Sequence, residues 1–136
     1  QKVTRPLREL LSIPFFGYHR IDLNGQYVVL TDRPDWAEFY LENKFYVNDP
    51  YLKHPDNYCA GISFFSHFDS QQENSMIKAW SKKLQADEGI VLMEKNSITV
   101  EFFIFAGHQQ QGDFHKLYLS HLSLLRAFSK YFKKSL

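Results

Sequence analysis

The sequence has little that would direct it to a membrane or to the outside of a cell. It contains a single cysteine, Cys59, so no disulfide can form within the chain, and a reducing compartment fits this usage. No apolar run is long enough to cross a membrane, and the first residues lack a secretory-signal pattern. We therefore expect a cytoplasmic protein with no membrane partner.

Strong charge of either sign is also absent. The formal net charge is only +1 at pH 7, which gives no electrostatic reason to expect that this chain itself binds nucleic acid. Catalytic motifs are missing as well: there is no G-x-S-x-G, no phosphate-binding loop and no cysteine–histidine pattern. The six histidines are scattered, and His115 and His121 are not spaced to face each other on a helix. We expect no enzyme, no metal site and no cofactor.

Aromatic residues are what the chain has in excess. Its 136 residues include 13 Phe and 8 Tyr, and aromatic residues make up 17% of the whole. Rings of this size must fill the core, line a cavity, or do both. The length fits one domain with one core.

Hydrophobic periodicity predicts an alternation of helices and strands. Apolar residues at helical spacing predict helices over residues 6–12, 36–43, 70–86 and 113–134. Strand-like runs lie at residues 15–23, 26–31, 60–68, 89–94 and 97–105. Asn24-Gly25 and Lys95-Asn96 join four of these runs as two hairpins, while prolines keep residues 45–58 irregular.

The resulting order, α-ββ-α-β-α-ββ-α, predicts an α/β (α+β) fold. Hairpins imply an antiparallel sheet, and the amphipathic helices must cover its faces. We therefore expect an α-β-α sandwich around a five-stranded antiparallel sheet of the PAS or GAF kind. Asp32 or Asp35 is the expected cap of the second helix, with Pro34 in its first turn.

The most informative segment is DWAEFYLENKFYVNDP, residues 35–50, which contains the spacing W-x3-Y-x8-D-P. Trp36 and Tyr40 lie four apart and share one side of a helix. Asp49 precedes Pro50, which disfavours helix and marks the exit into an extended stretch. A wall of rings with one placed acceptor is typical of a small-molecule site. The alternative is an ordinary amphipathic helix over a core, with Asp49 in a local turn.

This motif, together with the order of elements, resembles the autoinducer-binding domain of LuxR-type quorum-sensing transcription regulators. The family pattern has Trp, three residues, Tyr, eight residues, Asp-Pro, then a second Trp and later a Gly at the start of a strand. Trp36, Tyr40, Asp49 and Pro50 match with the spacing intact, and Gly89 matches the later glycine.

Other positions agree with the family or depart from it. Phe45 takes a position that is usually aromatic in the family. The second tryptophan is absent, and Phe64 or Phe65 stands in its region. A phenylalanine keeps the apolar packing but has no indole donor. Met93 stands where the family usually has proline.

The resemblance implies a function for residues 1–136 as a sensor domain that binds an acyl-homoserine lactone or a similar amphiphilic signal. It implies that the Trp36 indole donates to the lactone carbonyl and that Asp49 accepts from the ligand amide. Tyr40 would then contact the acyl chain. Strand alternation adds candidates that are equally compatible with ordinary core positions: Tyr18, Tyr27, Phe64, Phe65, Phe103 and Phe105.

The resemblance also implies partners. LuxR-type regulators carry a helix-turn-helix domain after the sensor, and we expect that domain to be absent from residues 1–136. We expect the signal to control DNA binding through a homodimer, with Leu124 and Tyr131 of the last helix at the contact. The alternative is a ligand-free PAS-like module for dimerisation or protein interaction, whose pocket is closed by its own aromatic residues.

Overall fold

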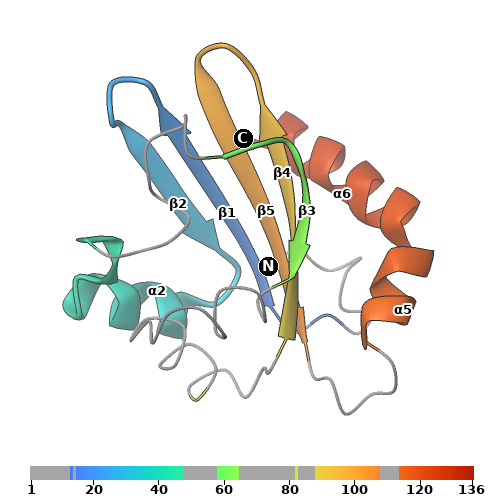
Figure 1. Cartoon of the computed structure of the whole chain (residues 1–136). Helices are drawn as coiled ribbons and strands as arrows, with labels where there is room; N and C mark the ends of the chain where they lie inside the picture. Colours follow the sequence, from blue (N-terminus) through green and yellow to red (C-terminus); the bar gives the residue numbers. More distant parts are fainter. Residues whose placement is uncertain (1–12, 14, 48–57, 65–81, 83–87, 108–113) are drawn as a thin grey trace.

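Five strands form one antiparallel sheet in the computed structural model, which describes residues 13, 15–47, 58–64, 82, 88–107 and 114–136. The spatial order is β2-β1-β5-β4-β3 (Figure 1). The strands are β1 Phe15–Asp22, β2 Tyr27–Thr31, β3 Gly61–Phe64, β4 Glu88–Lys95 and β5 Thr99–Gly107. The described helices are α2 Pro34–Glu42, the 3₁₀ turn η1 Phe45–Val47, α5 Phe114–Ser120 and α6 Leu122–Lys134.

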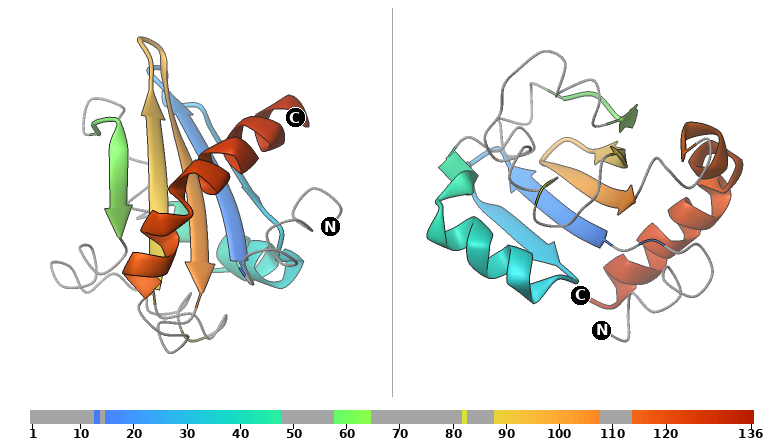
Figure 2. Two further views of the ribbon diagram at one scale, coloured as in Figure 1. Left: turned by 90° about the vertical axis from the view of Figure 1, so that its right-hand side faces the viewer. Right: turned by 90° about the horizontal axis from the view of Figure 1, so that it is seen from below.

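The helices lie on opposite faces of the sheet. Seen from below, α2 lies on one side of the strands and α5 with α6 lies on the other (Figure 2). This is the predicted α-β-α sandwich with a five-stranded antiparallel sheet, so the expected fold class is confirmed.

Local hydrogen bonds close the two hairpins. The Asp22 carboxylate accepts from the backbone N–H groups of Asn24 and Gln26, at 2.9 and 3.0 Å. Gly25 has φ +81°, a backbone conformation that glycine adopts without strain. In the second hairpin Asn96 Oδ1 accepts from the N–H groups of Ile98 and Thr99, at 2.9 and 2.8 Å. Both turns fall at the predicted asparagines, within a residue or two of the predicted strand ends.

Alternation along the strands divides the apolar residues between two cores. Paired residues of β1, β5 and β4 share a face, because directly opposed side chains in a sheet point the same way. The core under α2 is formed by Phe15, Ile21, Trp36, Tyr40, Val91, Val100, Phe102, Ile104 and Ala106. The core under α5 and α6 is formed by Ile13, Phe16, Tyr18, Ile90, Leu92, Phe103, Phe105, Tyr118, Leu125, Phe128 and Phe132.

The helices differ from the prediction in two ways. The single helix expected over residues 113–134 is two helices, since the chain leaves helical geometry at His121, with φ −108° and ψ 18°. No glycine or proline marks this break, so the sequence did not predict it. Neither Asp32 nor Asp35 caps α2: the N-cap is Arg33, with no side-chain cap bond, although Pro34 does open the helix. The helices expected over residues 6–12 and 70–86 lie outside the described residues apart from Lys82.

A buried carboxylate ties α6 to the sheet. Glu101 of β5 accepts from the Tyr18 hydroxyl at 2.5 Å and from Lys133 Nζ of α6 at 2.9 Å. Burial, and next the bond to Glu101, raises the pKa of Tyr18 above its usual range. The bond to Glu101 raises the pKa of Lys133. These contacts hold the end of α6 against the β1–β5 pair.

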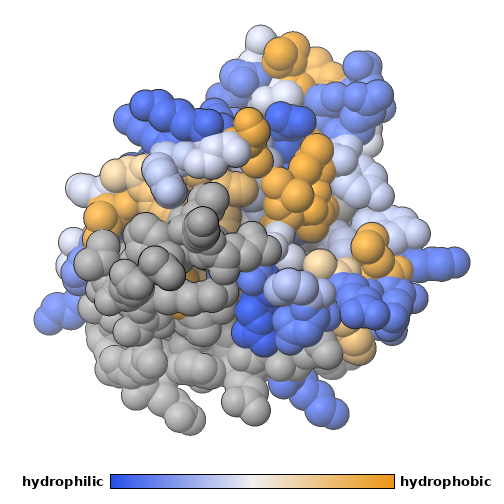
Figure 3. All heavy atoms as spheres, turned by 180° about the vertical axis from the view of Figure 1, so that it is seen from behind, coloured by the Kyte–Doolittle hydropathy of each residue, from blue (hydrophilic) through white to orange (hydrophobic). Residues whose placement is uncertain are grey.

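The described surface is mixed rather than uniformly polar. The back view shows hydrophobic atoms in several groups among polar ones (Figure 3). Large hydrophobic residues that are exposed include Leu23 and Ile98 at the two hairpin tips, Leu30 of edge strand β2 and Leu41 of α2. Scattered exposed apolar residues of this kind are normal.

Removing the Tyr18 hydroxyl should weaken the structure. We expect Tyr18→Phe to lower the free energy of unfolding by about 1.5–3 kcal/mol, the usual range for a hydrogen bond to a charged group. The matched control is Tyr131→Phe on the exposed side of α6, which should stay within about 0.5 kcal/mol. Urea unfolding at neutral pH measures both, and equal losses in the two variants would contradict the role of the bond.

The burial of tyrosine hydroxyls should also make the stability of the protein depend on pH in the alkaline range. Burial also raises the pKa of Tyr118 to about 12. In the unfolded chain a tyrosine ionises near pH 10, whereas Tyr18 and Tyr118 stay neutral at that pH in the folded protein. The free energy of unfolding therefore keeps its full value below about pH 10 and falls as the pH rises further. The fall should be shallower in Tyr18→Phe, and an unchanged slope of unfolding free energy against pH would contradict this assignment.

Candidate functional site

The position of α2 is set by contacts with β1. Asp32 is buried between β2 and α2, and its Oδ1 accepts from the Phe16 N–H at 2.9 Å. The Asp32 N–H donates to the Phe16 carbonyl at 3.2 Å, and the Thr31 hydroxyl donates to the same carbonyl at 3.0 Å. The chain therefore leaves the sheet at a defined point, and Pro34 starts the helix directly after it.

The end of α2 folds back beneath its own aromatic residues. Lys44 has φ 53°, a left-handed conformation that ends the helix and turns the chain. Phe45 then stacks on Trp36, with ring centroids 5.9 Å apart and an interplanar angle of 15°. It also contacts the ring of Tyr40 at 6.3 Å. These contacts fix the orientation of the Trp36 indole.

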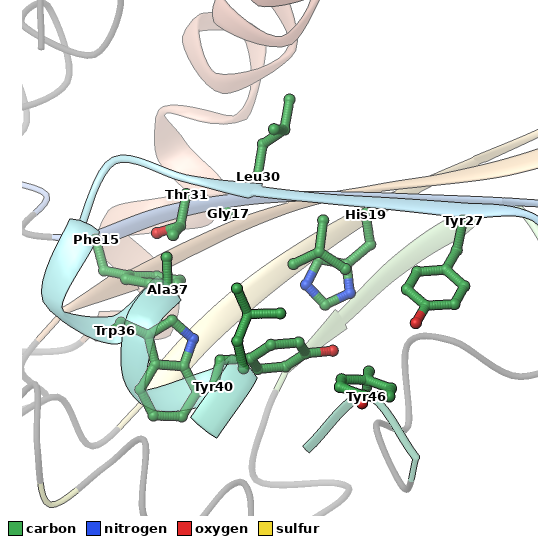
Figure 4. Close-up of a pocket in the computed structure, with 12 residues that line it drawn as sticks. Phe15, Gly17, His19, Tyr27, Leu30, Thr31, Trp36, Ala37, Tyr40 and Tyr46 are labelled. Atoms are coloured by element: carbon green, nitrogen blue, oxygen red, sulfur yellow. The ribbon is translucent and has the colours of Figure 1, made fainter. Parts of the chain in front are cut away.

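A cavity of about 390 Å³ lies between the sheet and α2. Its lining comes from β1, β2, α2 and η1, and Figure 4 shows most of these side chains directed into the same space. The lining residues are Phe15, Gly17, His19, Tyr27, Val29, Leu30, Thr31, Trp36, Ala37, Tyr40, Leu41 and Tyr46. This volume lies toward the lower end of the range of about 300–1,000 Å³ typical of small-molecule sites.

Gly17 leaves room in the floor of the cavity. It stands in β1 between Phe15 and His19, the two side chains of that strand that line the same space. A Cβ at this position would lie 3.2 Å from Cε1 and 3.3 Å from Cζ of Phe15. Any larger residue would therefore press on the Phe15 ring or project into the cavity.

The lining combines rings with uncharged polar groups. No lysine, arginine, aspartate or glutamate lines the cavity among the residues that the structure describes. The edge of the Trp36 indole that carries the nitrogen is turned toward the sheet (Figure 4). Within the described part of the chain, no group accepts a hydrogen bond from that indole. The arrangement suits an uncharged molecule that is mostly apolar and carries a few hydrogen-bonding groups.

The structure brings together three of the residues singled out from the sequence. Trp36, Tyr40 and Tyr27 line the cavity, and Phe45 supports Trp36 from behind. Gly89 lies in β4, where it pairs with Ala106.

Other predicted residues lie elsewhere. Tyr18 and Phe103 pair with each other on the opposite face, in the core under α5 and α6, and do not line this cavity. Phe105 belongs to the same core. The register explains this, because the odd-numbered residues of β1 face α2 and Tyr18 is even-numbered. Asp49, Pro50 and Phe65 lie outside the described residues, and for Phe64 only the backbone, opposite Ile90, is described.

Nine lining residues were missed from the sequence, and three of them matter most for the shape and polarity of the cavity: Gly17, His19 and Tyr46. A signal for the first two was present. In this strand Gly17 and His19 alternate with the rings of Phe16 and Tyr18, and such small or polar positions on one face of a buried strand can mark a cavity wall. Nothing in the sequence marked Tyr46, because its place depends on the turn at Lys44.

The described residues offer neither a metal-binding cluster nor a membrane-spanning helix. They contain no group of three or more His, Cys, Asp or Glu side chains placed to hold a metal ion. None of the helices in this part of the chain has the length and hydropathy needed to span a bilayer.

The fold is shared with a known regulator. The structure of Escherichia coli SdiA, a LuxR-type regulator, matches 98% of this chain and 60% of its own length, with TM-score 0.68 and 14% identity. A structure of SdiA in complex with octanoyl-rac-glycerol covers 98% of this chain and 59% of its own, with TM-score 0.62 and 14% identity. Neither a protein-family model nor a curated protein matches the sequence. The predicted resemblance to the autoinducer-binding domain is thus confirmed at the level of the fold.

The chain spans about 60% of the length of SdiA. At this level of identity the likeness concerns the arrangement of the backbone. The part of the fold that carries Trp36 and Tyr40 lies within the matched region, since the match covers nearly the whole chain.

The stack of Phe45 on Trp36 should contribute measurably to stability. We expect Phe45→Ala to lower the free energy of unfolding by about 1–2 kcal/mol, less than for a fully buried ring because Phe45 is half-buried. The matched control is Val47→Ala in the same 3₁₀ turn, which is 64% exposed and should stay within about 0.5 kcal/mol. Chemical denaturation of both variants tests the contact, and similar values for the two would contradict it.

Proposed function

We propose that this chain is the signal-binding domain of a LuxR-type transcription regulator and that it binds a small uncharged amphiphile between the sheet and α2. The observation that carries the proposal is the cavity of about 390 Å³ walled by Trp36 and Tyr40. These are the two aromatic residues of the W-x3-Y-x8-D-P pattern, and the fold around them is that of SdiA.

The lining supports an amphiphile rather than a charged metabolite. Phe15, Val29, Ala37 and Leu41 offer apolar surface for a hydrocarbon chain. A charged group buried there would lose its hydration, and no lysine, arginine, aspartate or glutamate among the described lining residues would compensate it. The octanoyl-glycerol bound in SdiA is an uncharged amphiphile of this kind. Acyl-homoserine lactones are the second class that fits, as the resemblance implies.

The polar head would be held by Trp36 and Asp49. The Trp36 indole donates to a carbonyl of the ligand in this proposal, and Phe45 keeps the ring in place for it. Asp49 accepts from a donor of the head group, as the motif implies. A carboxylate bound to such a donor makes a charge-assisted bond, which is stronger than a neutral one.

Signal binding would act on transcription through a separate DNA-binding domain. We propose that residues 1–136 act as the sensor in the cytoplasm, without catalysis, and that ligand favours the compact, dimer-competent state. Leu124 and Tyr131 of α6 are both exposed and remain the candidate dimer contact. A ligand-free interaction module is the alternative, and the absence of any ligand response would favour it.

Binding of either class of amphiphile should raise the melting temperature. At a ligand concentration of about 100 times Kd, the gain in unfolding free energy is about 2.7 kcal/mol. Thermal unfolding with increasing N-octanoyl-homoserine lactone or octanoylglycerol measures this gain, and octanoate serves as the charged control. A melting temperature that neither uncharged ligand changes would contradict the proposed function.

Substitution of the head-group residues should weaken binding without unfolding the chain. We expect Trp36→Phe to weaken the lactone by about 1–2 kcal/mol, the range for one hydrogen bond with its desolvation, and Asp49→Asn to weaken it more strongly because the carboxylate charge is lost. Glu42→Gln, at the exposed end of α2, is the matched carboxylate-to-amide control. Calorimetric titration gives the dissociation constants, and unchanged binding in Asp49→Asn would refute its role.

A further inference from the structure

The cavity has a polar region that the proposed contacts of Trp36 and Asp49 do not use. His19, Tyr27, Tyr40 and Tyr46 all line it, and each carries a group that can both donate and accept a hydrogen bond. We call these four residues the polar quartet. They come from β1, β2, α2 and η1, so four separate elements contribute one member each.

Ring contacts and strand register hold the polar quartet together. The ring centroids of Tyr27 and Tyr46 are 6.4 Å apart at an interplanar angle of 27°, and those of Tyr40 and Tyr46 are also 6.4 Å apart. His19 pairs with Val29, two residues from Tyr27, so His19 and Tyr27 are diagonal neighbours on one face of the hairpin. In Figure 4 the Tyr40 hydroxyl and the His19 ring point toward the same region as Tyr27 and Tyr46.

The chemistry of this region fits hydroxyl groups. Within the described part of the chain, nothing accepts a hydrogen bond from, or donates one to, the hydroxyls of Tyr27 and Tyr46. Tyrosine hydroxyls and a neutral imidazole both donate and accept, and an alcohol is the ligand group with the same dual capacity. A lactone ring offers acceptors only, so it can accept from the quartet but leaves the accepting side of the quartet unmatched.

We propose that the polar quartet recognises hydroxyl groups of the ligand, so that the pocket prefers an acyl ester of a polyol to an acyl lactone that bears no hydroxyl. His19 and Tyr27 are the specificity-determining residues in this arrangement. The inference rests on the proposed function, because it concerns the ligand class of the same cavity. It places hydroxyl recognition at a set of residues distinct from Trp36 and Asp49.

The test compares the binding of two ligands that share the same acyl chain. Each is measured with the unaltered protein and with three variants. Octanoylglycerol and N-octanoyl-homoserine lactone are titrated calorimetrically into the unaltered chain, His19→Leu and Tyr27→Phe, with Ser97→Ala in the turn between β4 and β5 as the control that removes an exposed hydroxyl. We expect His19→Leu and Tyr27→Phe each to weaken octanoylglycerol about five- to tenfold and to leave the lactone within about twofold. Ser97→Ala should change the affinity for neither ligand.

The outcomes separate the inference from the proposed function. Equal weakening of both ligands, or no weakening of octanoylglycerol, would overturn the role of the quartet while the proposed function stands. Failure of the unaltered chain to bind either ligand would overturn both. If His19→Leu melts at a lower temperature than the unaltered chain, Tyr27→Phe decides the question, because Tyr27 is 46% exposed and its ring is retained.

Discussion

The two-residue period of strand β1 is the constraint on which the rest of the structure depends. This strand lies second from the edge of the sheet, with helices on both faces, so its successive side chains serve two different interiors. Phe16 and Tyr18 enter the dense core under α5 and α6, where rings meet at centroid distances near 5 Å, as in the pair of Phe16 and Phe128 at 5.1 Å. Gly17 and His19 line the cavity under α2. One strand therefore joins a closed core and an open pocket, and a shift of one residue in its register would exchange them.

Each face is then secured by a buried carboxylate. Asp32 binds the backbone of Phe16 and determines where α2 leaves the sheet, while Glu101 binds Tyr18 and Lys133 and holds the end of α6. Both oxygens of Glu101 and Oδ1 of Asp32 accept hydrogen bonds, which offsets the cost of burying these acids. The pocket and the C-terminal helix are thus attached to the same central pair of strands, β1 and β5, from opposite sides. A ligand that orders α2 against β1 would act on the strand that also contacts α6.

Aromatic residues pack differently on the two faces of the sheet. Under α6 the rings of Phe16, Phe105 and Phe128 fill the available space. Under α2 the rings of Trp36, Phe39, Tyr40 and Phe45 pack on one another and form a wall instead, leaving about 390 Å³ beside them. The glycine in β1 and the left-handed turn at Lys44 account for this difference, because one removes a side chain from the floor and the other turns Phe45 behind the wall. The abundance of aromatic residues is therefore compatible with a ligand pocket and with a tight core in one small domain.

The sequence alone determined the elements and the fold class. The hairpins at Asn24-Gly25 and Asn96, the helix after Pro34, the antiparallel sheet and the pairing of Trp36 with Tyr40 all follow from local rules of turn chemistry and periodicity, which depend on near neighbours. Only the tertiary structure decided which face each strand residue serves and where helices break. In the sequence, Tyr18 and Phe103 are as suitable for a pocket as Tyr27, because a strand-like pattern does not show which face of the sheet covers the cavity. Gly17, His19 and Tyr46 became a cavity wall only when β1, β2, α2 and η1 were brought together, since a cavity is the space that several elements leave between them and no single segment encodes it.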